Sequence, residues 1–177
     1  MKKYIIITAI CMFLTAVPVQ AAEMFPDLSM KANMSPAHQE YLSVSGNEFK
    51  ISDIKADFVL IEVYSMYCPI CQRDAPKMNT VYDALTGGDV GGRIKVLGIA
   101  AGNTPYEVEF YRKKFKVEYP LVEDPDYVHH KAVEEVGTPA FYLVDLREGK
   151  RLILFSQVGE LKNVDAFLEM ILETAGK

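Results

Sequence analysis

The chain has 177 residues, half of them hydrophobic and 24% charged, which is enough for one globular domain with a sizeable core. The 19 basic and 24 acidic residues give a formal net charge of −5, and no basic stripe interrupts this balance. Such a charge is unfavourable for binding nucleic acid or an anionic membrane surface, so we expect neither as a partner.

The first 21 residues have the composition of a secretory signal peptide. Lys2 and Lys3 precede an apolar stretch over residues 4–17, and the small residue Ala21 marks a cleavage site. The apolar stretch is short for a bilayer span, so cleavage is favoured over the alternative of an uncleaved membrane anchor. Cleavage would remove two lysines, taking the net charge from −5 to −7, and would also remove Cys11. We therefore expect a periplasmic protein with two cysteines and no stable membrane insertion.

Residues 22–47 follow with an irregular pattern. Pro26, Pro36 and Gly46 interrupt any periodicity, so this segment is predicted to be an extended lead-in to a single domain over residues 48–177.

Within residues 48–177, apolar runs rich in β-branched and aromatic residues alternate with segments of helical spacing. This alternation predicts an α/β domain with a mixed central sheet and helices on both faces. After a short strand at 48–51, strands are predicted at 56–64, 94–101, 119–122, 140–144 and 152–157, and helices at 69–85, 105–115, 126–136 and 163–173.

Cys68 and Cys71 lie where a buried strand is predicted to end and a helix to begin. A disulfide between residues so close in sequence constrains the unfolded chain little, so the pair favours redox chemistry over a structural role. The free amides and the positive end of the helix dipole would stabilise a thiolate at Cys68, and Pro69 is compatible with the first helical turn. Cys71 is one turn further along. We therefore predict Cys68 as the nucleophile and Cys71 as the shielded resolving cysteine.

Glu62 is a carboxylate within the apolar run at 56–64. A buried carboxylate is costly unless it is neutral or has a partner, so burial should raise the pKa of Glu62. We predict that Glu62 exchanges a proton with Cys71 during resolution, the alternative being an exposed position at a sheet edge.

Cys68–Pro69–Ile70–Cys71, followed by Pro76 and, far downstream, by Thr138–Pro139 at the start of a strand, resembles the thioredoxin superfamily. The segment 119–124, inside an additional strand–helix unit, resembles the exported TlpA-like and ResA-like thiol-disulfide oxidoreductases. The resemblance covers residues 48–175. It implies a thioredoxin-like fold with an extra strand–helix insertion before a cis-proline.

By this resemblance, Pro139 is the cis-proline beside the dithiol, and a substrate peptide pairs with the backbone around Thr138. Tyr67, Pro69 and Ile70 complete the expected substrate-binding residues, with Tyr67 where the family commonly has tryptophan. The implied substrates are protein thiols or disulfides, served by a membrane or periplasmic redox partner and without a cofactor. The resemblance favours a disulfide reductase, although an oxidase would need the same residues.

Two other functions share parts of this pattern. Ser65-x-x-Cys68 resembles part of the peroxiredoxin motif, but that motif has a proline where Ile61 stands. A copper-handling thioredoxin-fold protein could use the cysteines with a histidine, but such proteins space their cysteines one residue wider. The only histidines are His38, His129 and His130, and no metal site is predicted.

Overall fold

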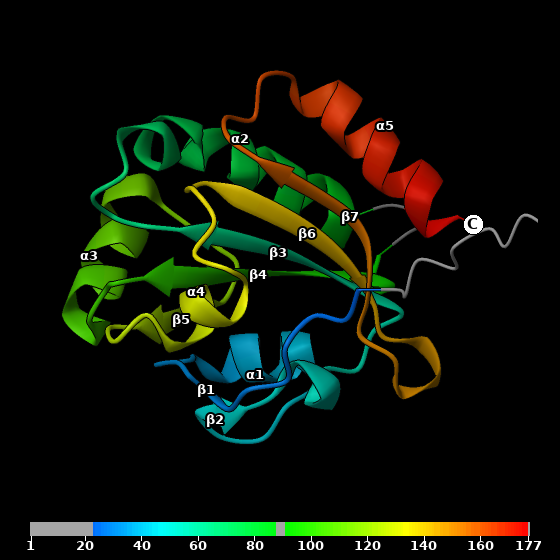
Figure 1. The fold of residues 1–177 in the computed structure, drawn as a ribbon, viewed down its shortest axis with the longest axis horizontal. Helices are drawn as coiled ribbons and strands as arrows, with labels where there is room; N and C mark the ends of the chain where they lie inside the picture. The colour runs from blue at the N-terminus through cyan, green and yellow to red at the C-terminus, as the bar shows by residue number, and fades with distance from the viewer. Residues whose placement is uncertain (1–22, 88–90, 177) are drawn as a thin grey trace, which may run out of the picture.

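A seven-stranded mixed sheet forms the centre of the computed structural model, which describes residues 23–87 and 91–176 (Figure 1). The strand order is β2–β1–β5–β4–β3–β6–β7, with β3, β4 and β5 parallel and with β1, β6 and β7 antiparallel to their neighbours. The predicted α/β fold with a mixed sheet is confirmed. The elements are β1 (Met30–Lys31), α1 (Pro36–Leu42), β2 (Glu48–Phe49), β3 (Phe58–Tyr64), α2 (Pro69–Thr86), β4 (Ile94–Ala101), α3 (Pro105–Phe115), β5 (Leu121–Asp124), α4 (Val128–Ala132), β6 (Ala140–Asp145), β7 (Leu152–Val158) and α5 (Val164–Ala175).

Strand β3 is hydrogen-bonded on both edges, to β4 in parallel and to β6 in antiparallel orientation. All seven of its side chains are buried, as its continuous run of aromatic and β-branched residues predicts. The register places Glu62 opposite Gly98 of β4 and Phe141 of β6. These pairings fix the position at which β3 ends and the segment carrying the cysteines begins.

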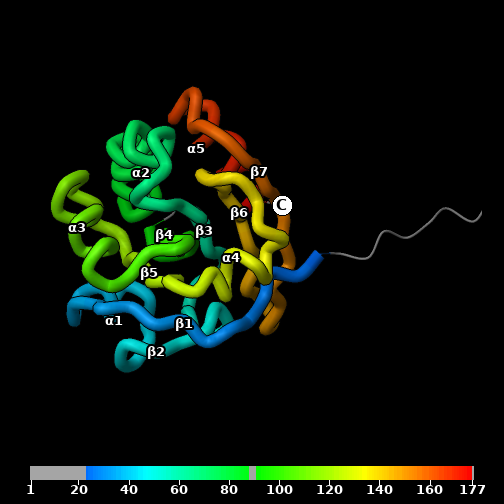
Figure 2. Tube along the Cα trace, turned by 60° about the vertical axis from the view of Figure 1, so that its left-hand side comes forward, coloured from blue at the N-terminus to red at the C-terminus, as the bar shows by residue number. Residues whose placement is uncertain are grey.

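The helices form two layers, one on each face of the sheet (Figures 1 and 2). On one face, α2, α3 and α5 pack over Leu60 and Tyr64. On the other, α1, the segment before β1 and the loop after α4 pack over Val59, Ile61 and Val63. Side chains alternate along a strand, so Glu62 belongs to the face that α2 covers.

The helix ends follow standard capping chemistry. Pro69 occupies the first turn of α2, Gly87 caps its end, and the helix continues through Pro76. Thr104 and Glu107 form a capping box at the start of α3, and Asn163 caps α5.

The described part of the predicted extended lead-in, residues 23–47, differs from that prediction. They contain α1, and β1 joins the sheet by pairing with both β2 and β5. The Ser35 side chain accepts the His38 amide at the start of α1, and Leu42 is completely buried. This segment is therefore packed onto the domain and covers one face of its sheet.

β5 and α4 supply the strand–helix unit predicted before Pro139. α4 spans Val128–Ala132, which is shorter than the expected helix over 126–136. It ends because Glu134 and Glu135 adopt left-handed backbone conformations, with φ of 63° and 51°.

The predicted signal peptide lies outside the described residues. Among residues 23–87 and 91–176, no helix combines the length and the apolar character needed to cross a membrane.

Met78 offers a test of the core beneath α2, because its side chain is fully buried against the sheet. We expect Met78→Ala to lower the free energy of unfolding by about 2–5 kcal/mol, through lost contacts and the cavity left behind. Urea denaturation followed by circular dichroism measures this change. Met24→Ala, at a side chain that is 47% exposed, is the matched control and should change stability little. Equal effects of the two substitutions would contradict this packing.

Candidate active site

Cys68 lies at the junction between β3 and α2, where its backbone is still extended and caps the helix. The Cys71 amide donates to Cys68 Sγ at 3.1 Å, so the sulfur replaces the carbonyl that a first-turn amide lacks. Such an amide at the positive end of a helix stabilises negative charge on the sulfur. Cys68 is also partly exposed, so this sulfur can meet a substrate.

Cys71 is buried one turn further along α2, and both cysteines are free thiols. Burial raises the pKa of the Cys71 thiol, and its hydrogen bond with Cys68 and the nearby charge of Glu62 raise it further. Its backbone carbonyl accepts the hydroxyl of Tyr111 at 2.9 Å, which ties this turn to α3. The two thiols thus have the predicted difference in accessibility.

The loop before β6 lies against the dithiol. The Thr138–Pro139 peptide bond is cis, as predicted, and the Cys68 thiol donates to the Thr138 carbonyl at 3.3 Å. This contact joins residues 70 positions apart in the sequence. The assignment of Thr138 and Pro139 to substrate binding stays a prediction.

His130 and Asp124 hold this loop in place, and neither role was predicted from the sequence. His130 Nε2 donates to the Val136 carbonyl at 2.7 Å, two residues before Thr138. Asp124 accepts the amides of His129 and His130 at 3.1 and 2.9 Å and thereby anchors α4 to β5. Their only signal in the sequence was an acidic residue near the predicted end of a strand, followed by a pair of histidines.

Glu62 is completely buried, as predicted, on the side of β3 that faces α2. Burial raises its pKa to about 7; the hydrogen bond from Tyr119 opposes this shift, and the negative charge of Asp74 adds to it. The Tyr119 hydroxyl donates to Glu62 Oε2 at 2.6 Å. Glu62 is therefore a carboxyl group that changes protonation near neutral pH.

Asp74 is a second buried carboxyl group, and it was not predicted from the sequence. It accepts the Leu161 amide at 2.7 Å and the Lys77 ammonium at 2.9 Å. Beside it, Arg73 pairs with Glu160 at 2.7 Å. Asp74 thus joins the active-site helix to the loop between β7 and α5.

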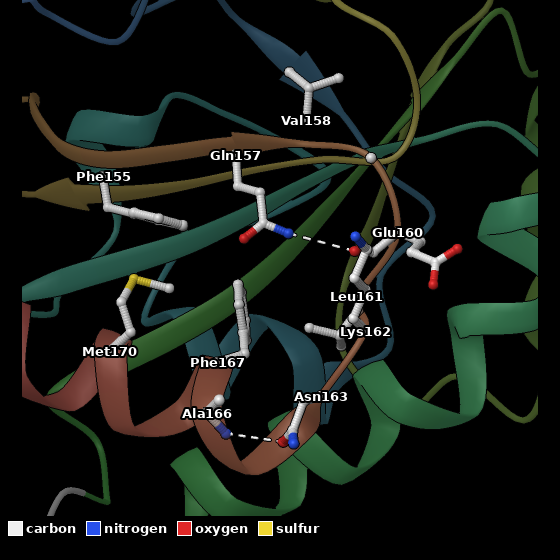
Figure 3. Close-up of a pocket in the computed structure, with 11 residues that line it drawn as sticks. Phe155, Gln157, Val158, Glu160, Leu161, Lys162, Asn163, Ala166, Phe167 and Met170 are labelled. Atoms are coloured by element: carbon white, nitrogen blue, oxygen red, sulfur yellow. Dashed lines mark hydrogen bonds between the residues drawn. The ribbon is translucent and has the colours of Figure 1, made fainter.

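That loop borders an open groove of about 720 Å³ between β7 and α5 (Figure 3). Phe155 and Gln157 reach from β7 toward α5, and Phe167 reaches back from α5. The groove begins beside the cis-proline, since the Gly159 amide donates to the Pro139 carbonyl at 2.8 Å. It contains none of the predicted site residues.

Tyr67 is an aromatic side chain beside Cys68 that is 65% exposed. Its hydroxyl donates to Glu107, which also accepts the Thr104 amide, so Tyr67 leans toward the start of α3. Ile70 is also exposed, and Pro69 follows Cys68 directly in the first turn of α2. The three residues flank Cys68 in the chain, and their contact with substrate stays a prediction.

The structure does not favour the two alternative functions. Ile61 is buried in the middle of β3 and pairs with both neighbouring strands, where a proline would remove a donor from the sheet. In the described part of the chain, no group of three or more His, Cys, Asp or Glu side chains could hold a metal ion. The rings of His38 and His130 are each hydrogen-bonded to a backbone carbonyl.

A thioredoxin-like fold that presents an accessible thiol beside a buried one defines a thiol-disulfide oxidoreductase. The chain belongs to the AhpC/TSA family, whose model matches residues 21–153, more than half of its length. This match includes both cysteines and Pro139. The predicted membership of the thioredoxin superfamily is confirmed.

Individual relatives agree with this class. The thiol-disulfide oxidoreductase ResA of Geobacillus kaustophilus is 25% identical over 129 residues, covering 72% of this chain and 71% of that protein. The structure of a protein from Chlorobium tepidum described as thiol:disulfide interchange protein DsbE has a TM-score of 0.70 at 16% identity, covering 90% of this chain and all of that one. A secreted disulfide oxidoreductase of Mycobacterium tuberculosis has a TM-score of 0.62 at 15% identity, covering 83% and 96%.

The raised pKa of Glu62 has a measurable effect on stability. Between its ordinary value of 4.5 and about 7, the folded protein binds a proton that the unfolded chain has lost, so stability falls as pH rises through this range. Glu62→Gln carries no such proton. From about pH 4 to about pH 8, the unfolding free energy of the wild type should therefore decrease by about 3 kcal/mol relative to that of the variant. Denaturant titrations across pH measure the difference, and parallel curves would contradict the shift.

Proposed function

We propose that the protein is an exported thiol-disulfide oxidoreductase that reduces disulfides of other exported proteins. The observation that carries the proposal is the asymmetry of the dithiol. Cys68 Sγ is partly exposed and bound by an amide at a helix start, whereas Cys71 is buried as a neutral thiol. A nucleophile must reach its substrate, and a resolving thiol must stay protected until the mixed disulfide has formed.

In the proposed reaction, the Cys68 thiolate attacks one sulfur of a substrate disulfide. A mixed disulfide forms, and the other substrate sulfur leaves as a thiolate that takes up a proton. Cys71 then gives its proton to Glu62 and attacks Cys68 Sγ. This attack releases the second substrate sulfur as a thiolate, which takes up a proton as Glu62 loses the one it received. The dithiol is oxidised by two electrons and the substrate disulfide is reduced to two thiols. A membrane or periplasmic dithiol partner returns the electrons.

The substrate is proposed to bind across the start of α2 and the cis-proline loop. Tyr67, Pro69 and Ile70 surround Cys68 on one side, and Thr138 and Pro139 lie on the other. An extended peptide could pair with the backbone at Thr138 while its disulfide meets Cys68. These contacts need no metal or cofactor from the protein.

Cysteine variants test the two roles. Cys68→Ser should reduce a disulfide-bonded model protein no faster than the uncatalysed reaction, because the attacking sulfur is missing. Cys71→Ser should instead accumulate a mixed disulfide between Cys68 and the substrate, visible by non-reducing electrophoresis and mass spectrometry. Ser65→Ala is a nearby control that keeps both sulfurs. A Cys71→Ser variant that turns over normally would refute the resolving role.

The direction of electron flow is tested by equilibrating the Cys68–Cys71 pair with glutathione buffers. A reductase should have a reduction potential more negative than the glutathione couple, so its disulfide form should persist in the buffer. A potential near that of strong oxidants would reverse the assignment. Consumption of peroxide faster than disulfide exchange would favour a peroxidase instead.

Export is tested on the protein recovered from cells. Removal of residues 1–21 predicts a mature chain that begins at Ala22 and fractionates outside the cytoplasm. Mass spectrometry of the purified chain identifies its first residue. A chain that retains the first 21 residues and stays in the membrane fraction would support the uncleaved anchor.

A further inference from the structure

Tyr119 is a fully buried tyrosine just before β5, and its hydroxyl contacts Glu62 from two strands away. Glu62 lies opposite Gly98 of β4, and Gly98 lies opposite Leu121 of β5. The Tyr119 ring therefore reaches past β4 to bring its hydroxyl within 2.6 Å of Glu62 Oε2. The Tyr119 ring can reach the buried carboxyl only if the neighbouring side chains in the core leave room for it.

Gly98 provides the space for this path. A Cβ at position 98 would lie 2.5 Å from Leu121 Cδ2, 3.2 Å from Tyr64 Cε1 and 3.3 Å from Tyr119 Cε2. Contacts this short would push one or more of these side chains away. The missing side chain at Gly98 thus allows the rings of Tyr64 and Tyr119 to pack beside Glu62.

The two oxygens of Glu62 have different surroundings. Oε2 accepts the Tyr119 hydroxyl, whereas Oε1 is buried without a hydrogen-bond partner among the described residues. A buried oxygen in this setting favours carrying the proton, because a charged and unpaired oxygen is costly there. The hydrogen bond from Tyr119 thereby distinguishes the two oxygens.

We propose that Tyr119 is a positioning residue of the exchange reaction, holding Glu62 Oε2 as an acceptor so that Oε1 is the oxygen that exchanges a proton with the Cys71 thiol. The inference rests on the proposed function, in which Glu62 takes the proton of Cys71. The inference names Tyr119 as the group that orients the Glu62 carboxyl and sets the pH range in which that carboxyl can accept a proton.

Few other groups around Glu62 could set its pKa. The pKa of Glu62 rises by burial, falls through the Tyr119 hydrogen bond, and rises through the charge of Asp74. The residues opposite Glu62 on β4 and β6 do not titrate. The other titratable or charged groups facing the cluster include Tyr64 on β3, Cys71 and Tyr82 on α2, and Tyr111 and Arg112 on α3.

The test is a titration of the Glu62 carboxyl by carbon-13 NMR, which needs no substrate. Tyr119→Phe keeps the ring and removes the donor, so the Glu62 midpoint should move upward by about one pH unit, the size expected for one hydrogen bond to a charged group. Tyr82→Phe is the matched control, because its ring packs 5.9 Å from that of Tyr119 but its hydroxyl donates no hydrogen bond to Glu62, whose donor is Tyr119. An unchanged midpoint in Tyr119→Phe would overturn the inference.

Kinetics then test whether Tyr119 acts through Glu62. In Tyr119→Phe, the pH dependence of the disulfide-exchange rate should shift to higher pH. Adding Tyr119→Phe to Glu62→Gln should not lower the exchange rate further. A merely structural role for Tyr119 would slow both backgrounds equally, which would overturn the inference. A wild-type protein with no exchange activity would refute the proposed function and leave the NMR midpoints as an independent result.

A second variant keeps the test decisive if Tyr119→Phe does not fold. Replacing Tyr119 with 3-fluorotyrosine preserves the shape of the ring and makes its hydroxyl a stronger donor. The Glu62 midpoint should then move downward, opposite to the effect of Tyr119→Phe. A midpoint that does not move downward would also overturn the inference.

Discussion

The pairing of β3 on both edges is the constraint on which the rest of the site depends. β4 and β6 hold the strand in a single register, so the position where it ends is fixed. Cys68 therefore meets the start of α2 on one side and the loop before β6 on the other, with the Thr138 carbonyl 3.3 Å from its sulfur. The same register places Glu62 in the core beneath α2, so one strand positions both the accessible sulfur and the buried carboxyl.

Asp74 in α2 and Glu62 in β3 are buried carboxyl groups that differ in their hydrogen-bond donors. Asp74 accepts hydrogen bonds from a lysine and a backbone amide, and these bonds join α2 to the loop before α5. Glu62 has one neutral donor, Tyr119, so ionising it is costly and its pKa rises. Asp74 thus joins two elements of the fold, whereas the pKa of Glu62 lies near neutral pH.

The central part of the fold could be predicted from the sequence because its signals are local. The apolar run of β3 and the helix predicted to begin at Pro69 correspond to the structure closely. α1 was missed because seven residues leave little periodicity to detect, and β1 depends on pairing with β5, which lies far away in the sequence. The burial of Glu62 followed from its apolar neighbours, but its partner, 57 residues away, depends on ring packing across β4 that no local pattern contains.

The contact between Cys68 and Thr138 makes the surface of the loop before β6 depend on oxidation state. A protonated Cys68 thiol donates to the Thr138 carbonyl, but a thiolate or a disulfide sulfur has no proton to give. Each deprotonation or oxidation of Cys68 therefore leaves that carbonyl free to accept another donor, such as the amide of an extended peptide. The availability of a backbone acceptor beside Pro139 is in this way linked directly to the chemical state of the sulfur.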